Sequence, residues 1–115
     1  MDKSLTVCVT GAAGQIAYSF IPQLLRGVVF PGASIKLKLL DITPALGALK
    51  GVAMEIQDCT YPNMESVEFG DNPSEIFKDC DVIVFLGGFP RKQGMERKDL
   101  LQMNKKIFVE QGKAL

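Results

Sequence analysis

The sequence contains no histidine, so no imidazole of these 115 residues can transfer protons or bind a metal ion. It has only three cysteines, and their wide spacing excludes a Cys-x-x-Cys zinc or redox motif. Cys8 and Cys80 lie in apolar runs, where we expect them to be small buried hydrophobic residues. The cysteine pattern favours a reducing, cytoplasmic setting, and we predict no metal site.

Long apolar runs and a net charge are also absent. No stretch approaches the ~20 apolar residues that span a bilayer, and the first residues lack the pattern of a signal or transit peptide. The 13 Lys and Arg residues balance 13 Asp and Glu residues. We therefore expect neither a nucleic acid nor a membrane as a partner. A chain of 115 residues, 47% of them hydrophobic, suits one domain with a modest core.

Strands and helices are predicted to alternate along the chain. Runs of apolar and β-branched residues predict strands over 5–10, 35–40 and 81–86, and a short strand around Val67 and Phe69. Apolar residues at helical spacing predict helices over 16–25, 43–56 and 97–115, and a one-turn helix that opens at Asn72. The alternation indicates an α/β fold, a Rossmann-like doubly wound parallel sheet of about four strands with helices on both faces.

Two prolines bear on the helices. Pro22 removes one backbone hydrogen bond inside the first helix and is expected to bend it. Pro44 suits the first position of the second helix, with Thr43 as its N-cap.

A glycine-containing turn, Gly11–Gly14, connects the first strand to the first helix. Glycines permit a tight turn and the close approach of a pyrophosphate, and a helix N-terminus offers free N–H groups to it. The spacing is G-x-x-G-x-x-A rather than G-x-G-x-x-G, so an ordinary connection is the alternative. Its position between a strand and a helix favours nucleotide binding.

Asp41 stands at the end of the second strand. An acidic residue there binds the adenine ribose hydroxyls of NAD and repels the 2′-phosphate of NADP. The alternative is a simple turn residue ahead of Thr43-Pro44. Gly87-Gly88 ends the last strand, either to let the nicotinamide half of a dinucleotide pass or only to stop the strand.

The polar segment 90–97 carries Arg91 and Arg97 at the carboxyl end of a predicted parallel strand. Guanidinium groups bind carboxylates bidentately, so two arginines suit a small dianion. A solvated charged loop is the alternative, and the pattern alone favours it.

Four blocks of the sequence together resemble the malate dehydrogenases of the cytosolic type. They are Val9–Tyr18 (VTGAAGQIAY), Leu39–Pro44 (LLDITP), Met54–Cys59 (MEIQDC) and Pro90–Leu101 (PRKQGMERKDLL). The last block separates that family from epimerase-type Rossmann enzymes, which also need a Tyr-x-x-x-Lys pair that this chain lacks.

The resemblance implies a role for each matching residue. Arg91 would clamp the distal carboxylate of the substrate, which favours malate over lactate, and Arg97 would polarise the substrate carbonyl as a catalytic residue. The residues implied to contact the NAD cofactor are Gly11, Ala12, Ala13, Gly14, Gln15, Ile16, Ala17, Asp41, Ile42, Gly87, Gly88, Asn104 and Gln111.

The resemblance also implies an activity, the NAD-dependent interconversion of malate and oxaloacetate by a cytoplasmic homodimer. The family's proton-transferring histidine would lie beyond residue 115. Residues 1–115 are therefore expected to be the N-terminal part of an NAD-binding domain, cut within a helix, inactive alone and lacking the substrate domain. A stand-alone nucleotide-binding or regulatory module is the alternative, and the two arginines disfavour it.

Overall fold

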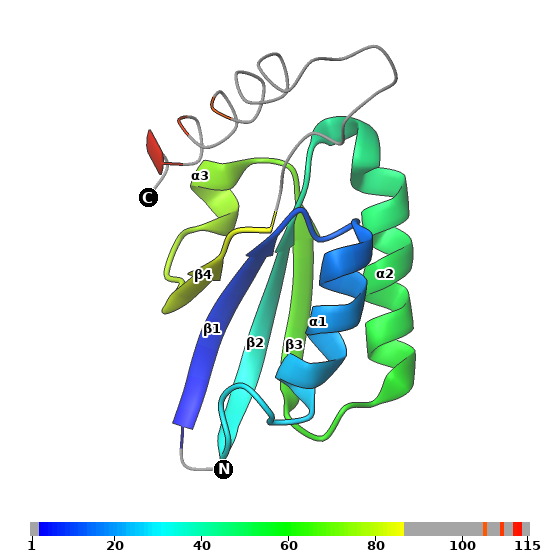
Figure 1. The fold of residues 1–115 in the computed structure, drawn as a ribbon, viewed down its shortest axis with the longest axis vertical. Helices are drawn as coiled ribbons and strands as arrows, with labels where there is room; N and C mark the ends of the chain where they lie inside the picture. Colours follow the sequence, from blue (N-terminus) through cyan, green and yellow to red (C-terminus); the bar gives the residue numbers. More distant parts are fainter. Residues whose placement is uncertain (1–2, 87–104, 106–108, 110–111, 114–115) are drawn as a thin grey trace.

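The computed structural model describes residues 3–86, 105, 109 and 112–113. Strands and helices alternate through them as predicted (Figure 1). In chain order the elements are β1 (Lys3–Thr10), α1 (Gln15–Leu25), β2 (Ala33–Leu40), the 3₁₀ helix η1 (Thr43–Ala45), α2 (Leu46–Cys59), β3 (Met64–Gly70), α3 (Pro73–Ile76) and β4 (Val82–Val84).

The four strands form one parallel sheet in the order β3-β2-β1-β4. β1 pairs with β2 over its whole length, from Lys3 opposite Ala33 to Thr10 opposite Leu40. From β1 the chain moves outward to β3 and then returns to the other side of β1 to form β4. The sheet confirms the predicted Rossmann-like fold, with its topological switch point between β1 and β4.

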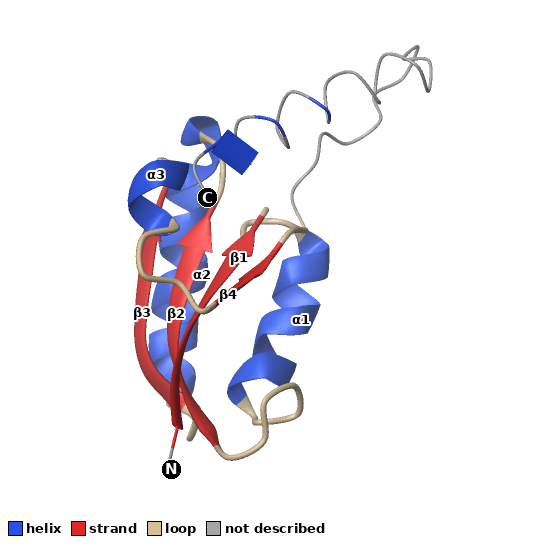
Figure 2. Ribbon diagram, turned by 90° about the vertical axis from the view of Figure 1, so that its left-hand side faces the viewer, coloured by secondary structure: helices blue, strands red, loops and turns tan. Residues whose placement is uncertain are grey.

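Helices α1 and α2 cover one face of the sheet (Figure 2). They cover it because each presents an apolar stripe at helical spacing that packs on the apolar side chains of the strands. The buried residues of this core include Val7, Val9, Ile21, Leu24, Leu25, Ile35, Leu37, Leu39, Leu49, Ala53 and Ile56.

The opposite face is apolar only toward the carboxyl ends of the strands. There Ile76 and Phe77 pack on Cys8 and Leu40. Toward the amino ends the strands carry polar side chains instead, and Ser4 and Ser34 both donate hydrogen bonds to the Glu65 carboxylate, at 2.8 and 3.2 Å. The short α3 is therefore the main cover of this face within the described residues.

Three local predictions need correction. Thr43 is not an N-cap: Ile42 occupies that position, and the Thr43 hydroxyl donates to Asp71 instead. The last strand has three residues rather than the predicted 81–86: before it, Asp81 bonds to Thr6 through its backbone N–H and its carboxylate, and after it the N–H of Leu86 donates to the Thr10 hydroxyl. Cys80 is only half-buried, whereas Cys8 is fully buried as predicted.

The predicted helix over 97–115 lies mostly outside the described residues, although Lys105, Val109, Gly112 and Lys113 are helical. α1 continues through Pro22 to Leu25. None of the helices in the described part of the chain combines the length and the apolar character needed to cross a membrane.

Gly27 ends α1 in a left-handed conformation, with φ of 85°. Its N–H donates to the carbonyl of Leu24, and that of Val28 donates to the carbonyl of Gln23, which together form a Schellman motif. A Cβ atom at Gly27 would collide with the side-chain amide of the buried Asn63. The backbone of Asn63 is fixed, because its main-chain carbonyl accepts from the N–H of Ile35 at 2.7 Å.

We expect Gly27→Ala to lower the free energy of unfolding by more than the roughly 1–2 kcal/mol that left-handed backbone costs an L-residue. Gly32→Ala is the matched control, because Gly32 has φ of 79° but open space around its Cβ position. Urea denaturation of both variants measures the difference. An equal loss in the two variants would contradict the steric role given to Asn63.

The cysteines should differ sharply in reactivity. Burial raises the pKa of Cys8 to about 12, which leaves almost no thiolate at pH 8, whereas the Cys59 side chain is exposed. Iodoacetamide is therefore expected to label Cys59 well before Cys8 in the folded protein, and both at similar rates in denaturant. Mass spectrometry of tryptic peptides over time reads both sites, and early labelling of Cys8 would contradict its burial.

Candidate dinucleotide site

The turn after β1 is sharp and closed by a backbone hydrogen bond. Gly11 has φ of 63°, a left-handed conformation that favours glycine. The N–H of Gly14 donates to the carbonyl of Gly11 at 3.0 Å. A Cβ atom at Gly14 would lie 3.2 Å from that carbonyl oxygen, so a larger residue would crowd the turn. The backbone therefore favours glycine at residue 11 and leaves little room for a larger residue at 14.

α1 begins directly after this turn with an open N-terminus. No side chain caps it, and its first turn holds no acidic residue. Gly14, Gln15 and Ile16 are exposed, whereas Ala12 and Ala17 are buried and pack beneath the turn. The first N–H groups of a helix lack intrahelical partners and lie at its positive end. This arrangement fits a phosphate group.

Asp41 lies beside the turn, where the sequence pattern predicted an acidic residue. Its Oδ2 accepts from the N–H of Ala13 at 2.9 Å, and its Oδ1 accepts from the N–H of Ile42 at 2.7 Å. An ionised carboxylate has about four acceptor positions, so these two bonds leave room for ribose hydroxyls. Ile42 is 49% exposed at the same edge, available for apolar contact with a base.

A second carboxylate at this edge was not predicted. The N–H of Asp41 donates to the carbonyl of Gly70, which places Asp71, the next residue, near Asp41 along the strand ends. The Thr43 hydroxyl donates to Asp71 Oδ2 at 2.7 Å and ties the loop after β2 to the loop after β3. Asp71 directly follows a strand, as Asp41 does, and this position is the sequence signal that could have identified it.

Thr10 was also missed. It is the last residue of β1, is fully buried, and accepts through Oγ1 from the N–H of Leu86 at 3.0 Å. This bond connects the two chain segments that flank the topological switch point.

The remaining predicted site residues lie outside the described residues. They are Gly87, Gly88, Arg91, Arg97, Asn104 and Gln111. Their roles stay predictions.

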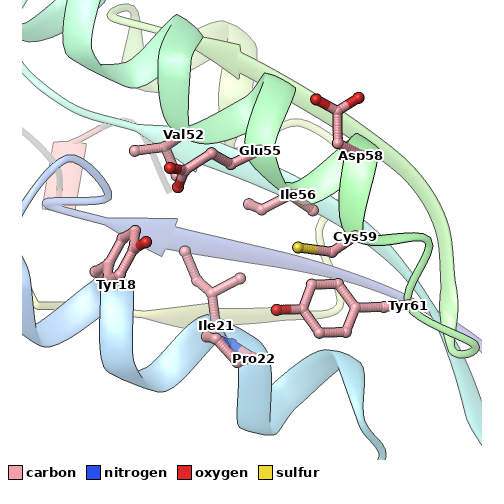
Figure 3. A pocket seen from close by; sticks show the side chains of 9 residues that line it. All are labelled: Tyr18, Ile21, Pro22, Val52, Glu55, Ile56, Asp58, Cys59 and Tyr61. Atoms are coloured by element: carbon pink, nitrogen blue, oxygen red, sulfur yellow. The ribbon is translucent and has the colours of Figure 1, made fainter.

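A groove of about 360 Å³ runs between α1 and α2 (Figure 3). Tyr18 and Ile21 of α1 face Glu55 of α2 across it. The Glu55 carboxylate raises the pKa of Tyr18, and burial raises the pKa of Tyr61, so both phenols remain donors at neutral pH. Among the described residues of the predicted cofactor set, none lines this groove.

The sequence matches the family described as "lactate/malate dehydrogenase, NAD binding domain" over residues 5–115. The chain belongs to this family of NAD-binding domains. The resemblance inferred from the four sequence blocks is thereby confirmed, together with the NAD cofactor it implied. An epimerase-type Rossmann protein is not supported.

The curated relatives of this NAD-binding domain include malate dehydrogenases of the cytoplasmic type. The rat protein is 53% identical and the human protein 52% identical, each over 116 aligned residues that cover 100% of this chain and 35% of the relative. The chain thus spans about a third of the length of these relatives.

Solved structures share the fold closely. The malate dehydrogenase of Naegleria fowleri is 38% identical with a TM-score of 0.94, over 100% of this chain and 36% of that one. The lactate dehydrogenase of Trichomonas vaginalis, solved in complex with NADH and oxamate, is 35% identical with a TM-score of 0.88, over 96% of this chain and 34% of that one.

We expect Asp41→Ala to destabilise the NAD-binding domain without ligand. The change removes the acceptor of two backbone N–H groups, and hydrogen bonds to charged groups contribute about 1.5–3 kcal/mol each. Asp41→Asn retains one acceptor oxygen and should lose less. Chemical denaturation measures both losses, and wild-type stability of Asp41→Ala would contradict the observed anchoring of the turn.

Proposed function

We propose that this chain is the dinucleotide-binding part of an NAD-dependent malate dehydrogenase, which interconverts malate and oxaloacetate by hydride transfer. One observation carries the proposal: the uncapped N-terminus of α1 and the Asp41 carboxylate meet at the carboxyl edge of the sheet. Ligands of open α/β sheets bind at this edge, beside the topological switch point. The names of the similar proteins support malate as the substrate.

In this proposal different parts of the site bind different parts of NAD. The first N–H groups of α1 and the turn Gly11–Gly14 hold the pyrophosphate. Asp41 accepts hydrogen bonds from the adenine ribose and repels a 2′-phosphate, while Ile42 contacts the adenine. Gly87, Gly88, Asn104 and Gln111 contact the rest of the cofactor. When bound, NAD supplies the hydride chemistry.

The proposed substrate contacts come from two arginines. Arg91 clamps the distal carboxylate of the dicarboxylic acid through bidentate hydrogen bonds. Arg97 polarises the carbonyl group and stabilises the charge that develops on its oxygen. Arg91 is the reason for proposing malate rather than lactate, because in the family the lactate-specific enzymes do not carry arginine at this position.

These 115 residues alone are proposed to lack turnover, because they contain no histidine to serve as the general acid and base. The homodimer and the cytoplasmic location implied by the resemblance also remain proposals; the location is supported by the names of the similar proteins. The alternative is a stand-alone nucleotide-binding module. It would share the cofactor geometry but would not need Arg91 and Arg97.

Cofactor specificity tests the role of Asp41. We expect NADH to bind more tightly than NADPH. Asp41→Ala should weaken the binding of NADH by roughly 10- to 100-fold, as the loss of hydrogen bonds to a charged group predicts. Asp58→Ala is the matched control, because Asp58 is exposed near the end of α2. Fluorescence titration gives the dissociation constants. Unchanged NADH affinity in Asp41→Ala would remove Asp41 from the ribose site.

Turnover tests the substrate. NADH oxidation by the protein purified from its source should be far faster with oxaloacetate than with pyruvate, and Arg91→Gln should reduce that preference by at least about tenfold, because a bidentate contact is lost. The 115-residue chain serves as the inactive comparison. A preference for pyruvate would refute malate as the substrate, and NADH binding without either activity would favour the stand-alone module.

A further inference from the structure

Cys8 and Cys80 lie in one apolar cluster on the face of the sheet that α3 covers. Cys8 belongs to β1, is fully buried, and forms the cluster with Leu40, Ile76 and Phe77. Cys80 lies in the connection between α3 and β4, packs against the same cluster and is partly exposed. The fold thus brings together two cysteines from distant parts of the chain, although nothing in their sequence spacing indicates it.

The two thiols are in direct contact and are fixed in place. They form a hydrogen bond with each other, and the Cys80 thiol also donates to the carbonyl of Ile76 at 3.2 Å. The N–H of Asp81, the next residue, donates to the carbonyl of Thr6 in β1 at 2.8 Å. A bond between the two sulfur atoms therefore requires a shift of side chains rather than of strands.

An ammonium group lies beside the pair. Lys38 stands directly opposite Cys8 in the register of β1 and β2, and its Nζ donates to the carbonyl of Lys78, near Cys80, at 2.7 Å. Burial raises the pKa of both thiols, that of Cys8 to about 12, and the charge of Lys38 opposes this rise in each. Because Cys80 is the more exposed thiol, a small reagent from solvent reaches it first.

We propose that Cys8 and Cys80 are a redox-active pair that forms a disulfide inside the folded domain when hydrogen peroxide reaches it. In a reducing compartment such a pair is normally reduced, and its disulfide is transient. Within the part of the chain that the structure describes, the pair belongs to no group of three His, Cys, Asp or Glu side chains that could hold a metal ion. The disulfide would tie β1 to the connection that enters β4.

The oxidation takes two steps. The Cys80 thiolate attacks one oxygen of hydrogen peroxide, the O–O bond breaks, and the departing hydroxide takes up the thiol proton as water, which leaves a sulfenic acid on Cys80. The sulfur of Cys8 then attacks the sulfur of Cys80, the S–O bond breaks, and hydroxide leaves with the Cys8 proton as a second water. Two thiols thereby lose two electrons, and one peroxide is reduced to two waters.

Peptide mapping of the unmodified protein tests the pair. Cleavage after Lys and Arg places the three cysteines on separate peptides, 4–26, 51–78 and 79–91. After peroxide treatment under native conditions, peptide 4–26 should be linked to peptide 79–91, and dithiothreitol should remove the link. Neither of these two peptides contains methionine, so methionine oxidation does not change their masses.

Cys59 provides the internal control. It is exposed and should react with peroxide before Cys80 does, but it lies on peptide 51–78. Links to this peptide should be at least about tenfold rarer than the link between Cys8 and Cys80 in the folded protein, because a disulfide needs neighbouring Cβ atoms. In denaturant all three links should form to comparable extents. Absence of the Cys8–Cys80 link under native conditions, or equally abundant links to Cys59, would overturn the inference.

Two variants test the order of the steps. In Cys80→Ser, the buried Cys8 should stay reduced in peroxide. In Cys8→Ala, the sulfenic acid on Cys80 has no thiol to condense with, so dimedone should trap it, whereas in the unmodified protein the disulfide forms instead. Oxidation of Cys8 in Cys80→Ser as fast as in the unmodified protein would overturn the role given to Cys80.

Discussion

The parallel pairing of β1 with β2 is the constraint on which the rest of the molecule depends. All eight residues of each strand take part, and the last four residues of β1 are fully buried. Because the register is unbroken, the two strands end at the same level, and Gly11 and Asp41 leave the sheet side by side. The bond from Ala13 to Asp41 and the position of α1 both follow from that shared ending.

The local features of the site could be predicted from the sequence because local rules determine them. Glycines at a strand-to-helix turn, an aspartate at a strand end and Asn72 as an N-cap each depend on a few neighbouring residues; the Asn72 side chain does accept from the N–H of Ser74. The partners of Asp71 and Leu86 could not be predicted in the same way. Their bonds join residues 28 and 76 positions apart, so they depend on the assembled sheet.

Thr43 illustrates how tertiary contacts override a local preference. By sequence it suits an N-cap, in which its hydroxyl oxygen would accept from a backbone N–H. In the structure the hydroxyl instead donates to the carboxylate of Asp71 on the neighbouring loop. Ile42 then takes the cap position without any side-chain hydrogen bond. Side chains also contribute at the two ends of β4, where the Asp81 carboxylate accepts from the N–H of Thr6 beside a backbone bond between the same residues, and the Thr10 hydroxyl accepts from the N–H of Leu86. Arg91 and Arg97 remain known only from the sequence.

The bond between Asp41 and the N–H of Ala13 has a kinetic consequence. It holds the turn through groups of the chain itself, so a phosphate group that binds there meets a backbone already fixed by a hydrogen bond. Little conformational entropy remains to be lost on binding. The association rate constant is then not slowed by ordering of the turn. Differences in affinity between related dinucleotides arise mainly from their dissociation rate constants.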